Sequence, residues 1–377
     1  MPRRVLLCAT GLSPQVVTET LFSLAAAGAG ERFVPDEVHV VTTTRGAEAV
    51  RLMFIDERAN QLARLCEQYT LPMPKVKLHL MQGPEGALDD LRSASQNDAA
   101  ADSILQVVRE LTAKDDTTIH FSIAGGRKTM GYYLGTCASL LGRPQDRMSH
   151  VLVNEPFESA PEFFFPPRPP QILQLRGGPA DTARARIDLA AVSFIRMRSL
   201  LPAPLIEKGS FTQLVAVVDG MLVNPGIVLR ILARPAGRNA CPTEVEISGG
   251  LRFTLPAKSF ALYWLLAQQA KRGHPWVRPA TEARIIQRDY LEIYRLAAGV
   301  GTKYDEEAEI LAINDGHFKT NLYKNAISRL SDNLKKTLGE PAARIYGPHG
   351  RGQGDALEHA LAMQASAIRL ERSKAAH

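Results

Sequence analysis

Over the first 175 residues, short uninterrupted apolar runs alternate with longer segments in which apolar residues recur every three or four positions. Short apolar runs bounded by turn residues are typical of buried strands, and the longer period is typical of amphipathic helices. The pattern predicts strands at 5–9, 38–42, 76–80, 117–123 and 149–153, and helices at 15–27, 47–69, 102–113 and 128–141. This alternation, with uncharged strand centres, predicts an α/β domain whose parallel-rich sheet is covered on both faces.

Three of the predicted strands end in small polar residues. Residues 10–13 (Thr-Gly-Leu-Ser) follow the first strand, 42–45 (Thr-Thr-Thr-Arg) end the second, and 124–128 (Ala-Gly-Gly-Arg-Lys) follow the fourth. Ligands of parallel α/β sheets bind at the carboxyl ends of the strands. We therefore expect these three segments to converge on one crevice.

The stretch 119–130 runs from a buried strand through two glycines and two cations into a helix. Glycines let the backbone turn sharply and approach a ligand closely, and the first turn of a helix offers unpaired N–H groups. With Arg127 and Lys128 added, this turn suits a phosphate or another anion. An ordinary strand-to-helix turn with two solvated charges explains the same residues equally well, because short glycine motifs recur by chance.

A proline-rich stretch marks the end of this first part. Residues 163–170 read Phe-Phe-Phe-Pro-Pro-Arg-Pro-Pro, a composition that disfavours regular structure. Residues 188–200 carry apolar residues at helical or mixed spacing, and either pack back on the sheet or link two domains. We expect a first domain at 1–175, a connector at 176–206 and a second domain at 207–377.

The second half has a different, mostly helical pattern. It predicts helices at 211–218, 259–270 and 317–338, an apolar segment at 226–233, a hairpin around 248–250, and a strand at 343–346 that enters a glycine-rich hairpin at 347–352. The last helix places Ile327, Leu330 and Leu334 on one face. Helix, helix and hairpin in this order predict a mostly α winged helix-turn-helix domain.

Charge near the end of the chain favours a polyanionic partner. From 317 to 352 there are seven lysines and arginines against two acids, whereas the whole chain of 377 residues has a formal net charge of only +6. A solvated helix face usually explains such charges, but the adjoining hairpin favours contact with DNA or RNA. The candidate contacts are Arg329, Lys335, Lys336 and Arg351.

Cysteine spacing and hydropathy exclude several classes of protein. The four cysteines are scattered, without the spacing of a zinc site or a disulfide framework. The apolar run at 5–9 is too short for a signal peptide, and no stretch reaches the length of a membrane span. We expect a soluble, cytoplasmic protein without a metal site. His39, His120 and His150 fall within strand cores, where we expect structural roles.

Taken together and in order, the strand-end motifs resemble those of CARF domains, the CRISPR-associated Rossmann-like sensors of cyclic oligoadenylate. The motifs are Cys-Ala-Thr-Gly-Leu-Ser-Pro at 8–14, Val-Thr-Thr-Thr at 41–44 and Ala-Gly-Gly-Arg-Lys-Thr-Met at 124–130. The resemblance covers about the first half of the chain and is greatest to the ring-nuclease branch and the CRISPR-associated NE0113 family within it. The second half, through 255–262 and 326–339, is similar to winged-helix domains of response regulators.

The resemblance implies a homodimer that binds one cyclic oligoadenylate ring across its two-fold axis, with cyclic tetraadenylate as the expected ring. It also implies cleavage without a metal or another cofactor. The ribose 2′-OH beside each scissile phosphate is the nucleophile, so the protein needs only to orient it and to stabilise charge on phosphorus. The expected products are linear adenylates with 2′,3′-cyclic phosphate ends, and their formation would switch off type III CRISPR signalling.

The resemblance also implies roles for individual residues. Ser13 would position ribose or phosphate, Lys128 would steady the transition state or protonate the leaving oxygen, and Arg127 would hold a neighbouring phosphate or an acid of the partner subunit. Backbone donors and ligand-lining groups would come from Thr10, Gly11, Leu12, Thr43, Thr44, Gly125, Gly126 and Thr129. Gln82 opens a polar segment, 82–90, that either closes over the ring or is a plain solvated loop.

Two other functions stay open at this point. One is a regulator that binds nucleic acid through the winged helix when the ring is bound, and the other is an effector whose second half cuts RNA. Arg344 and His349 have the R-x4-H spacing of HEPN ribonucleases, but that motif opens a helix, and residues 345–348 are not expected to be helical. The effector is the least favoured, because the second half contains no recognisable acid–base set.

Overall fold

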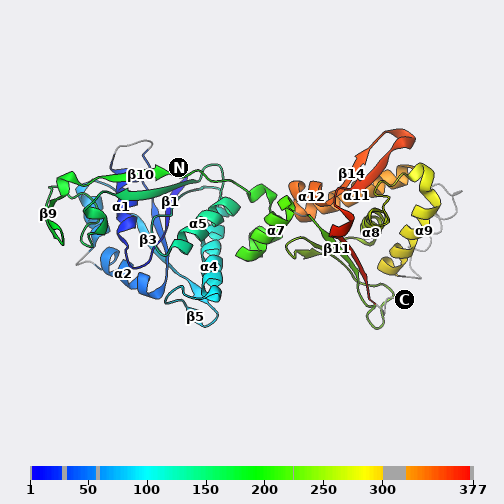
Figure 1. The fold of residues 1–377 in the computed structure, drawn as a ribbon, viewed down its shortest axis with the longest axis horizontal. Coiled ribbons are helices and arrows are strands. Elements are labelled where there is room, and N and C mark those ends of the chain that lie inside the picture. Colours follow the sequence, from blue (N-terminus) through cyan, green and yellow to red (C-terminus); the bar gives the residue numbers. More distant parts are fainter. Residues whose placement is uncertain (1, 28–31, 57–59, 224, 300–319, 374–377) are drawn as a thin grey trace. The chain divides into compact units, whose positions relative to one another are not determined.

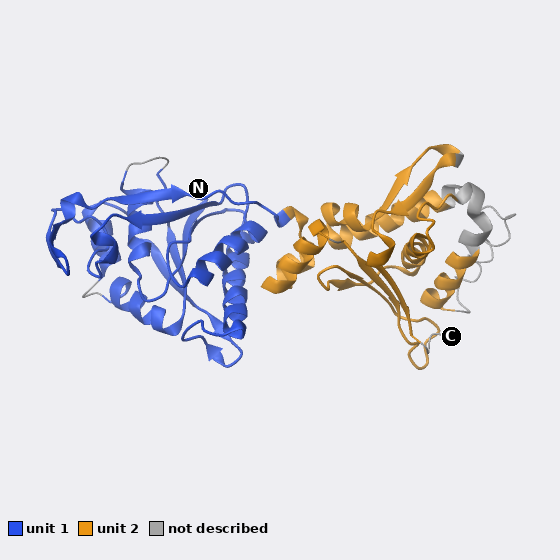
Figure 2. Cartoon of the chain, viewed as in Figure 1, with its two compact units in different colours: residues 1–198 blue, residues 199–377 orange. Residues whose placement is uncertain are grey.

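The computed structural model describes residues 2–27, 32–56, 60–223, 225–299 and 320–373. Two compact units divide the chain, unit 1 at residues 1–198 and unit 2 at residues 199–377 (Figure 1, Figure 2). Each unit has its own sheet and its own buried apolar residues. Within the described ranges, no helix combines the length and the hydrophobicity needed to cross a bilayer.

A sheet of six described strands forms the centre of unit 1. In spatial order, its strands are β10 (Ile187–Ala191), β7 (Arg147–Val153), β6 (Thr117–Ser122), β1 (Arg3–Ala9), β2 (Glu37–Thr42) and β3 (Lys75–Leu80). Neighbours from β7 to β3 pair in parallel, and β10 pairs antiparallel with β7. The predicted parallel-rich sheet is confirmed. β10 extends it with residues that the sequence assigned to the connector.

Helices cover both faces of this sheet (Figure 1). They are α1 (Gln15–Ala25), α2 (Thr44–Phe54), α3 (Gln61–Gln68), α4 (Ala94–Thr112) and α5 (Lys128–Leu141). The first three share a hydrophobic core with alternate residues of β1 and β2, such as Leu6, Cys8 and Val40. The other two pack against each other and against β6 on the opposite face. The α/β fold expected from the sequence is therefore confirmed.

Two predicted elements of unit 1 have different bounds. The helix expected at 47–69 is two helices, and Asn60 starts the second by accepting a hydrogen bond from the backbone N–H of Ala63 at 2.8 Å. The polar segment 82–90, for which a plain loop was one expectation, contains a short hairpin of β4 (Gln82–Gly83) and β5 (Gly86–Ala87), and the helix expected at 102–113 begins earlier, at Ala94. Ser93 begins that helix with a reciprocal capping box.

The chain after β7 remains part of unit 1 as far as residue 198. β8 (Ile172–Leu175) and β9 (Gly178–Asp181) form a hairpin ahead of β10. Arg196 then donates from Nε to the carbonyl of Arg143 at 2.9 Å, and Arg198 donates from Nη1 to the carbonyl of Leu141 at 3.0 Å. These bonds tie the segment after β10 to the end of α5. The two units consequently divide at 198, within the segment 176–206 that the sequence assigned to the connector.

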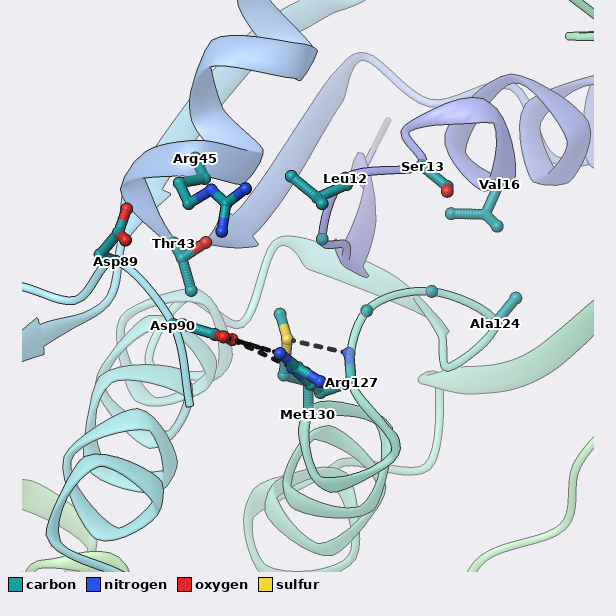
Figure 3. Close-up of a pocket in the computed structure, with 13 residues that line it drawn as sticks. Leu12, Ser13, Val16, Thr43, Arg45, Asp89, Asp90, Ala124, Arg127 and Met130 are labelled. Carbon is teal, nitrogen blue, oxygen red and sulfur yellow. Dashed lines mark hydrogen bonds and ion pairs between the residues drawn. The ribbon is translucent and has the colours of Figure 1, made fainter. Parts of the chain in front are cut away.

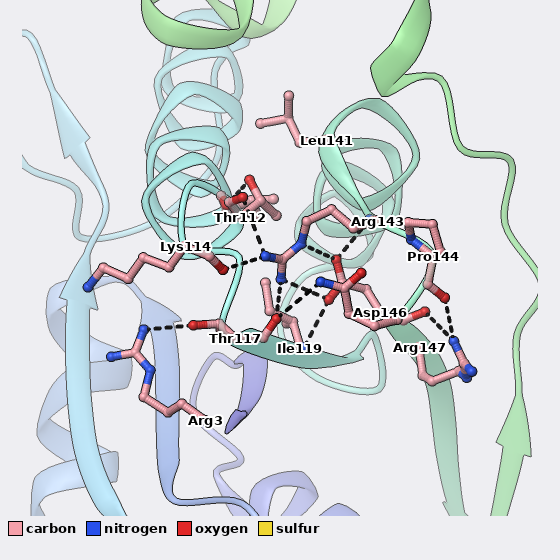
Figure 4. A network of polar contacts seen from close by, with 12 residues as sticks. Arg3, Thr112, Lys114, Thr117, Ile119, Leu141, Arg143, Pro144, Asp146 and Arg147 are labelled. Carbon is pink, nitrogen blue, oxygen red and sulfur yellow. Dashed lines mark hydrogen bonds and ion pairs between the residues drawn. The ribbon is translucent and has the colours of Figure 1, made fainter. Parts of the chain in front are cut away.

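A buried ion pair joins the end of α5 to the beginnings of β6 and β7 (Figure 4). Arg143 donates from Nη2 and Nε to the two carboxylate oxygens of Asp146, each at 3.0 Å. Its guanidinium also donates to the carbonyls of Lys114 at 2.6 Å and Thr117 at 2.8 Å. Asp146 accepts in addition from the backbone N–H of Ile119 at 3.0 Å. Both side chains are almost completely buried, so these bonds satisfy charges that water does not reach.

Unit 2 is built around one helix. Its described helices are α6 (Ala203–Lys208), α7 (Phe211–Val223), α8 (Ala257–Lys271), α9 (Pro279–Ala298), α11 (Thr320–Leu338) and α12 (Glu340–Tyr346). Its main described sheet has the order β13 (Arg252–Phe253), β12 (Thr243–Ile247), β11 (Ile227–Ile231) and β16 (Ile368–Arg372). Residues 260–267 of α8 are all buried. A helix that is buried on every side forms the core of its unit.

The end of unit 2 contains a hairpin, but the residues predicted as the hairpin, 347–352, supply only its first strand, and the segment before it is helical. β14 (Pro348–Arg351) and β15 (Glu358–Leu361) pair antiparallel. Residues 343–346, predicted as a strand, instead form the last turn of α12, which Gly339 and Pro341 begin. The segment 345–348 is thus partly helical, although Arg344 lies in the last turn of a helix rather than opening one. On α11, Ile327, Leu330 and Leu334 share the buried face, as predicted.

Candidate ligand-binding site

The strand order places a switch point between β1 and β6. From β1 the chain continues to β2 on one side, while β6 lies on the other side. A crevice opens at such a point, between the loops that leave the two carboxyl ends. A cavity of about 410 Å³ lies there (Figure 3). Its lining residues are Gly11, Leu12, Ser13, Val16, Thr43, Arg45, Asp89, Asp90, Ala124, Gly125, Gly126, Arg127 and Met130.

Buried threonines shape the loop after β1. The Thr42 hydroxyl donates to the Thr10 carbonyl at 2.6 Å, and the Thr10 hydroxyl donates to the Ser13 carbonyl at 3.0 Å. Thr10 and Thr42 are fully buried, so they hold the turn instead of facing a ligand. The turn presents Leu12 and Ser13 to the cavity (Figure 3).

The loop after β6 requires its two glycines. A Cβ atom on Gly125 would lie 2.6 Å from the carbonyl oxygen of Ala9 and 2.7 Å from a methyl group of Val16. Gly126 has a φ of +78°, a backbone conformation that residues with a side chain rarely adopt. α5 begins directly after this loop, and its first turn adds positive potential beside the cavity. The loop therefore has the backbone geometry expected of an anion site.

An ion pair bounds one side of the cavity (Figure 3). Arg127 donates from Nη2 to the two carboxylate oxygens of Asp90, at 2.7 and 2.8 Å, and from Nε at 3.0 Å. Arg92 donates to the same carboxylate at 2.9 Å. The hydrogen bond from Arg127, followed by that from Arg92, holds the pKa of Asp90 well below its usual range. Arg127 is thus paired with an ionised acid of its own chain.

The end of β2 supplies the part of the wall next to Asp89 and Asp90. Thr43 caps α2 by accepting from the backbone N–H of Gly46 at 3.3 Å, and Arg45 lines the cavity beside it. Thr44 holds the 82–90 segment instead. Its hydroxyl donates to Asp89 at 2.9 Å, and its backbone N–H donates to the Leu88 carbonyl at 2.9 Å. These contacts place both acids of this segment in the cavity wall.

The structure gathers some of the predicted site residues and separates others. Those that line the cavity are Gly11, Leu12, Ser13, Thr43, Gly125, Gly126 and Arg127. Those that do not line it are Thr10, Thr44, Gln82, Lys128 and Thr129. Lys128 is exposed at the first position of α5, and Gln82 lies in β4, where its backbone N–H donates to Ser103 at 2.9 Å. The roles assigned to all twelve residues stay predictions.

Six lining residues were not among the individual site residues predicted from the sequence. They are Val16, Arg45, Asp89, Asp90, Ala124 and Met130. Arg45 and Ala124 lie within the strand-end segments 42–45 and 124–128 that were expected to converge, but no individual role was predicted for either. Asp89 and Asp90 lie in segment 82–90, for which closure over a ligand and a plain loop were both left open, and contacts with α2 and with Arg127 determine where they lie.

Unit 2 holds the residues predicted to contact nucleic acid. Arg329, Lys335 and Lys336 are exposed on α11. Arg351 lies on β14, where it pairs with Glu358 and its guanidinium carbon is 3.8 Å from the centre of the Trp276 ring. Its charge is therefore matched inside the unit. In the part of the chain that the structure describes, no group of His, Cys, Asp or Glu is arranged to hold a metal ion.

A family comparison decides the relationship of the chain. Residues 13–219, more than half of the sequence, match the model of the CRISPR-associated protein NE0113 family. The chain belongs to this family. The match extends over most of unit 1 and includes the cavity residues from Ser13 to Met130. This NE0113-family protein is thus CRISPR-associated, and its unit 1 has the α/β fold with a parallel-rich sheet that the sequence predicted.

Two solved structures are weakly similar to this NE0113-family protein. Enterococcus italicus Csm6 bound to cyclic hexa-2′-fluoro-hexa-dAMP matches at 10% identity and a TM-score of 0.26, over 89% of this chain and 56% of that one. Protein VC1899 from Vibrio cholerae matches at 10% identity and a TM-score of 0.25, over 95% of this chain and 62% of that one. The chain therefore spans less than two thirds of either structure, and similarity this weak carries no functional inference. No curated protein matches the sequence.

Proposed function

We propose that this protein is a ring nuclease, which binds cyclic oligoadenylate at the cavity between β1 and β6 and cleaves it to linear adenylates. The observation that carries this proposal is the meeting of Ser13, the glycine loop and Arg127 around one cavity at the switch point. The protein is CRISPR-associated by family. Removal of the ring would switch off type III CRISPR signalling.

The chemistry of the cavity wall suits phosphodiesters. Arg45 and Arg127 supply fixed positive charge, and the Gly125–Gly126 backbone allows a ligand to approach closely. Lys128 and the first turn of α5 lie directly beside the wall. Asp89 and Asp90 oppose an anion, so a bound phosphate would take the place of the carboxylate that Arg127 now holds.

Cavity volume favours a homodimer. Pockets for one drug-sized ligand span roughly 300–1,000 Å³, and this cavity of about 410 Å³ lies near the lower limit. A ring of four adenylates is several times larger than one nucleotide, so a single cavity would hold only part of it. Two cavities related by a two-fold axis would hold the whole ring. Sedimentation with and without the ring should detect a dimer, and a monomer under both conditions would contradict this arrangement.

The proposed reaction needs few protein groups. The 2′-oxygen of a ribose attacks the adjacent phosphorus, the P–O5′ bond breaks, and the 5′-oxygen leaves with a proton. The products carry a 2′,3′-cyclic phosphate at one end and a 5′-hydroxyl at the other. Ser13 would orient the ribose or phosphate, Arg127 would hold a neighbouring phosphate, and the Lys128 ammonium would neutralise charge or protonate the leaving oxygen. Cyclic tetraadenylate is the expected substrate.

A cleavage assay tests the activity directly. Purified protein in excess over cyclic tetraadenylate, with EDTA present, should convert the ring to linear adenylates that end in 2′,3′-cyclic phosphate. Lys128→Ala should slow this by about a hundredfold or more, because the variant loses both charge stabilisation and the proton donor. Lys114→Ala is the matched control, since that lysine is exposed at the opposite edge of the sheet. A ring that stays intact through a long single-turnover incubation would refute the proposed activity.

A second candidate function rests on the exposed cations of α11. Arg329, Lys335 and Lys336 lie close to the β14–β15 hairpin in sequence, and a winged helix-turn-helix unit would use such a helix and hairpin to grip DNA or RNA. The protein would then be a regulator that responds to the ring, and slow ring cleavage would limit the duration of its response. In this role, unit 2 would bind nucleic acid mainly through phosphates.

Gel shifts distinguish this second candidate. Binding of duplex DNA or single-stranded RNA should depend on added cyclic oligoadenylate and should weaken steeply with salt. Replacing both Lys335 and Lys336 with alanine should weaken it about equally on all sequences, because phosphate contacts carry no sequence information. If no nucleic acid binds at low salt, with or without the ring, the regulator is excluded.

A further inference from the structure

A second cavity adjoins the first across the loop after β1. Its volume is about 590 Å³, and the two cavities share Leu12, Ser13, Val16 and Ala124. Figure 3 shows Ser13 and Val16 at the end of the first cavity that is farthest from Asp89. The remaining walls come from α1, from β7 and from residues 158–161. A ligand that reaches past Ser13 from the first cavity would enter the second.

Glu19 is the unusual group in this second cavity. It is 8% exposed and lines the cavity, so it is largely buried from bulk solvent and lies beside the space that a ligand would occupy. Among the described residues, no hydrogen-bond donor is bound to its side chain. Burial, followed by the nearby charge of Glu158, raises the pKa of Glu19 to about 7. A large fraction of the molecules therefore carry a neutral carboxylic acid there at neutral pH.

No lysine or arginine of the described chain lines this cavity, in contrast to the first. Gln15 donates from Nε2 to the Pro161 carbonyl at 2.9 Å, while its Oε1 is buried without a partner among the described residues. Half-buried His150 lines the cavity from β7 and is therefore not the strand-core residue that its sequence position predicted. These groups suit a neutral, hydrogen-bonding ligand better than a phosphate.

We propose that the second cavity receives an adenine base of the ring whose phosphates lie in the first cavity, and that Glu19 recognises the N6 amino edge of this base. A neutral carboxyl can accept a hydrogen bond from the N6 amino group and donate its O–H to the neighbouring ring nitrogen. This bidentate pair satisfies both partners, as Gln does with adenine. The carboxylate form can only accept, and its charge opposes the lone pair of the ring nitrogen. The inference rests on the proposed function and adds a determinant of base specificity.

Two variants separate recognition of the base from a structural role. In a Lys128→Ala background, which should keep the ring intact, binding is measured for cyclic tetraadenylate and for the same ring with purine bases that lack the amino group. The protein should prefer the adenylate ring by about tenfold or more. Glu19→Gln should keep most of this preference, because an amide offers the same donor and acceptor. Glu19→Leu should abolish it. Glu67→Leu, an exposed position on α3, is the matched control.

The pH dependence gives an independent readout. The titratable groups that share the cavity with Glu19 are Glu158 and His150, whereas Asp188 on β10 lies on the opposite face from Leu189, which packs against α1. The charged residues of α3 are exposed. Affinity for the adenylate ring should fall by up to about tenfold per pH unit above the pKa of Glu19, because binding then requires protonation. In Glu19→Gln, affinity should be nearly independent of pH between 6 and 8.

The outcomes distinguish this inference from the function on which it rests. If neither ring binds, the proposed function fails and the inference fails with it. If the adenylate ring binds but Glu19→Leu keeps the full preference for adenine, only the inference is overturned. If Glu19→Gln loses the preference as completely as Glu19→Leu while both variants unfold at the wild-type temperature, the bidentate pair is also wrong.

Discussion

Two arginine–aspartate pairs flank α5 in unit 1. Arg127 precedes the helix and pairs with Asp90 at the carboxyl edge of the sheet, whereas Arg143 follows it and pairs with Asp146 at the amino edge. Side-chain exposure is 57% and 19% in the first pair, and 7% and 0% in the second. The same two residue types are thus used once at the surface and once in the interior.

The difference in burial separates a structural pair from an exchangeable one. The guanidinium of Arg143 is also bonded to backbone carbonyls around it, so every part of this network depends on the fold. Arg127 is bonded through its guanidinium to Asp90 alone among the described residues, beside an open cavity. Removing one partner of a buried pair leaves a charge without compensation, whereas an exposed pair contributes little in water. The amino edge therefore maintains the fold, and the carboxyl edge is free to exchange one anion for another.

The largest expected effect is on the buried pair. Asp146→Ala should lower the free energy of unfolding by about 3–5 kcal/mol, because Arg143 would remain buried without a countercharge. Urea denaturation at pH 7 measures this loss. Asp90→Ala is the same change at the other edge, and it should lower the denaturation midpoint far less, because an exposed ion pair contributes little in water. Equal losses in the two variants would contradict the distinction between the edges.

Glu19 extends the comparison to a buried acid without a countercharge. Its pKa is raised from 4.5 to about 7 in the folded protein, so the folded state holds a proton that the unfolded chain releases between those values. Stability due to this group should therefore fall as pH rises from 4.5 to 7, by about 3 kcal/mol in total, and then level off. Glu19→Gln should remove the decline. The test is the difference in unfolding free energy between wild type and variant at pH 5 and pH 8, and a constant difference would show that Glu19 titrates normally.

Local pattern was sufficient for much of unit 1. The apolar runs located β1, β2 and β6, and the expected bounds of α5 agree with the structure. The convergence of the strand-end segments on one crevice could then be predicted, because parallel strands present their carboxyl ends at one edge of the sheet. Some of the wrong predictions in both units could have been avoided, because the sequence contains residues that typically begin helices. Asn60 caps α3 within the segment predicted as one long helix, and Gly339 with Pro341 begins α12 where a strand was expected.

Other features depend on contacts that no local pattern records. Asp90 meets Arg127 across 37 residues of sequence, and segment 82–90 is held at the cavity by Thr44 and by Arg127. A run of polar residues has the same appearance whether it is solvated or docked. β10 was missed for a similar reason, since its short, half-exposed sequence becomes a strand by pairing with β7. The sequence therefore predicted the part of the cavity formed by the loops after β1 and β6 better than the part formed by Asp89 and Asp90.

A smaller effect, on affinity for the ring, is expected from replacing Arg127. Arg127→Ala should weaken binding of cyclic tetraadenylate by about tenfold, since one charged hydrogen-bonding contact with phosphate is lost. The slope of log affinity against log salt should also decrease by about one. Arg127→Lys is the matched control, because lysine keeps the charge but loses the bidentate geometry. Its affinity for the ring should lie between those of the wild type and Arg127→Ala. Calorimetric titrations at several salt concentrations measure both quantities. An unchanged salt slope in Arg127→Ala would exclude Arg127 as a phosphate contact.

The smallest expected effect is an increase in affinity for the ring, caused by a change at Asp90. Asp90→Asn removes the carboxylate that competes with phosphate for Arg127 but keeps the shape of the side chain, so affinity for the ring should rise by about threefold at low salt. The gain should shrink as salt increases, because screening weakens the competing pair. Asp89→Asn is the matched control, since that acid lines the same cavity but is bonded to the Thr44 hydroxyl. Weaker binding by Asp90→Asn would mean that Asp90 positions Arg127 for the ligand, and the carboxyl edge would then resemble the amino edge in using its ion pair to hold structure.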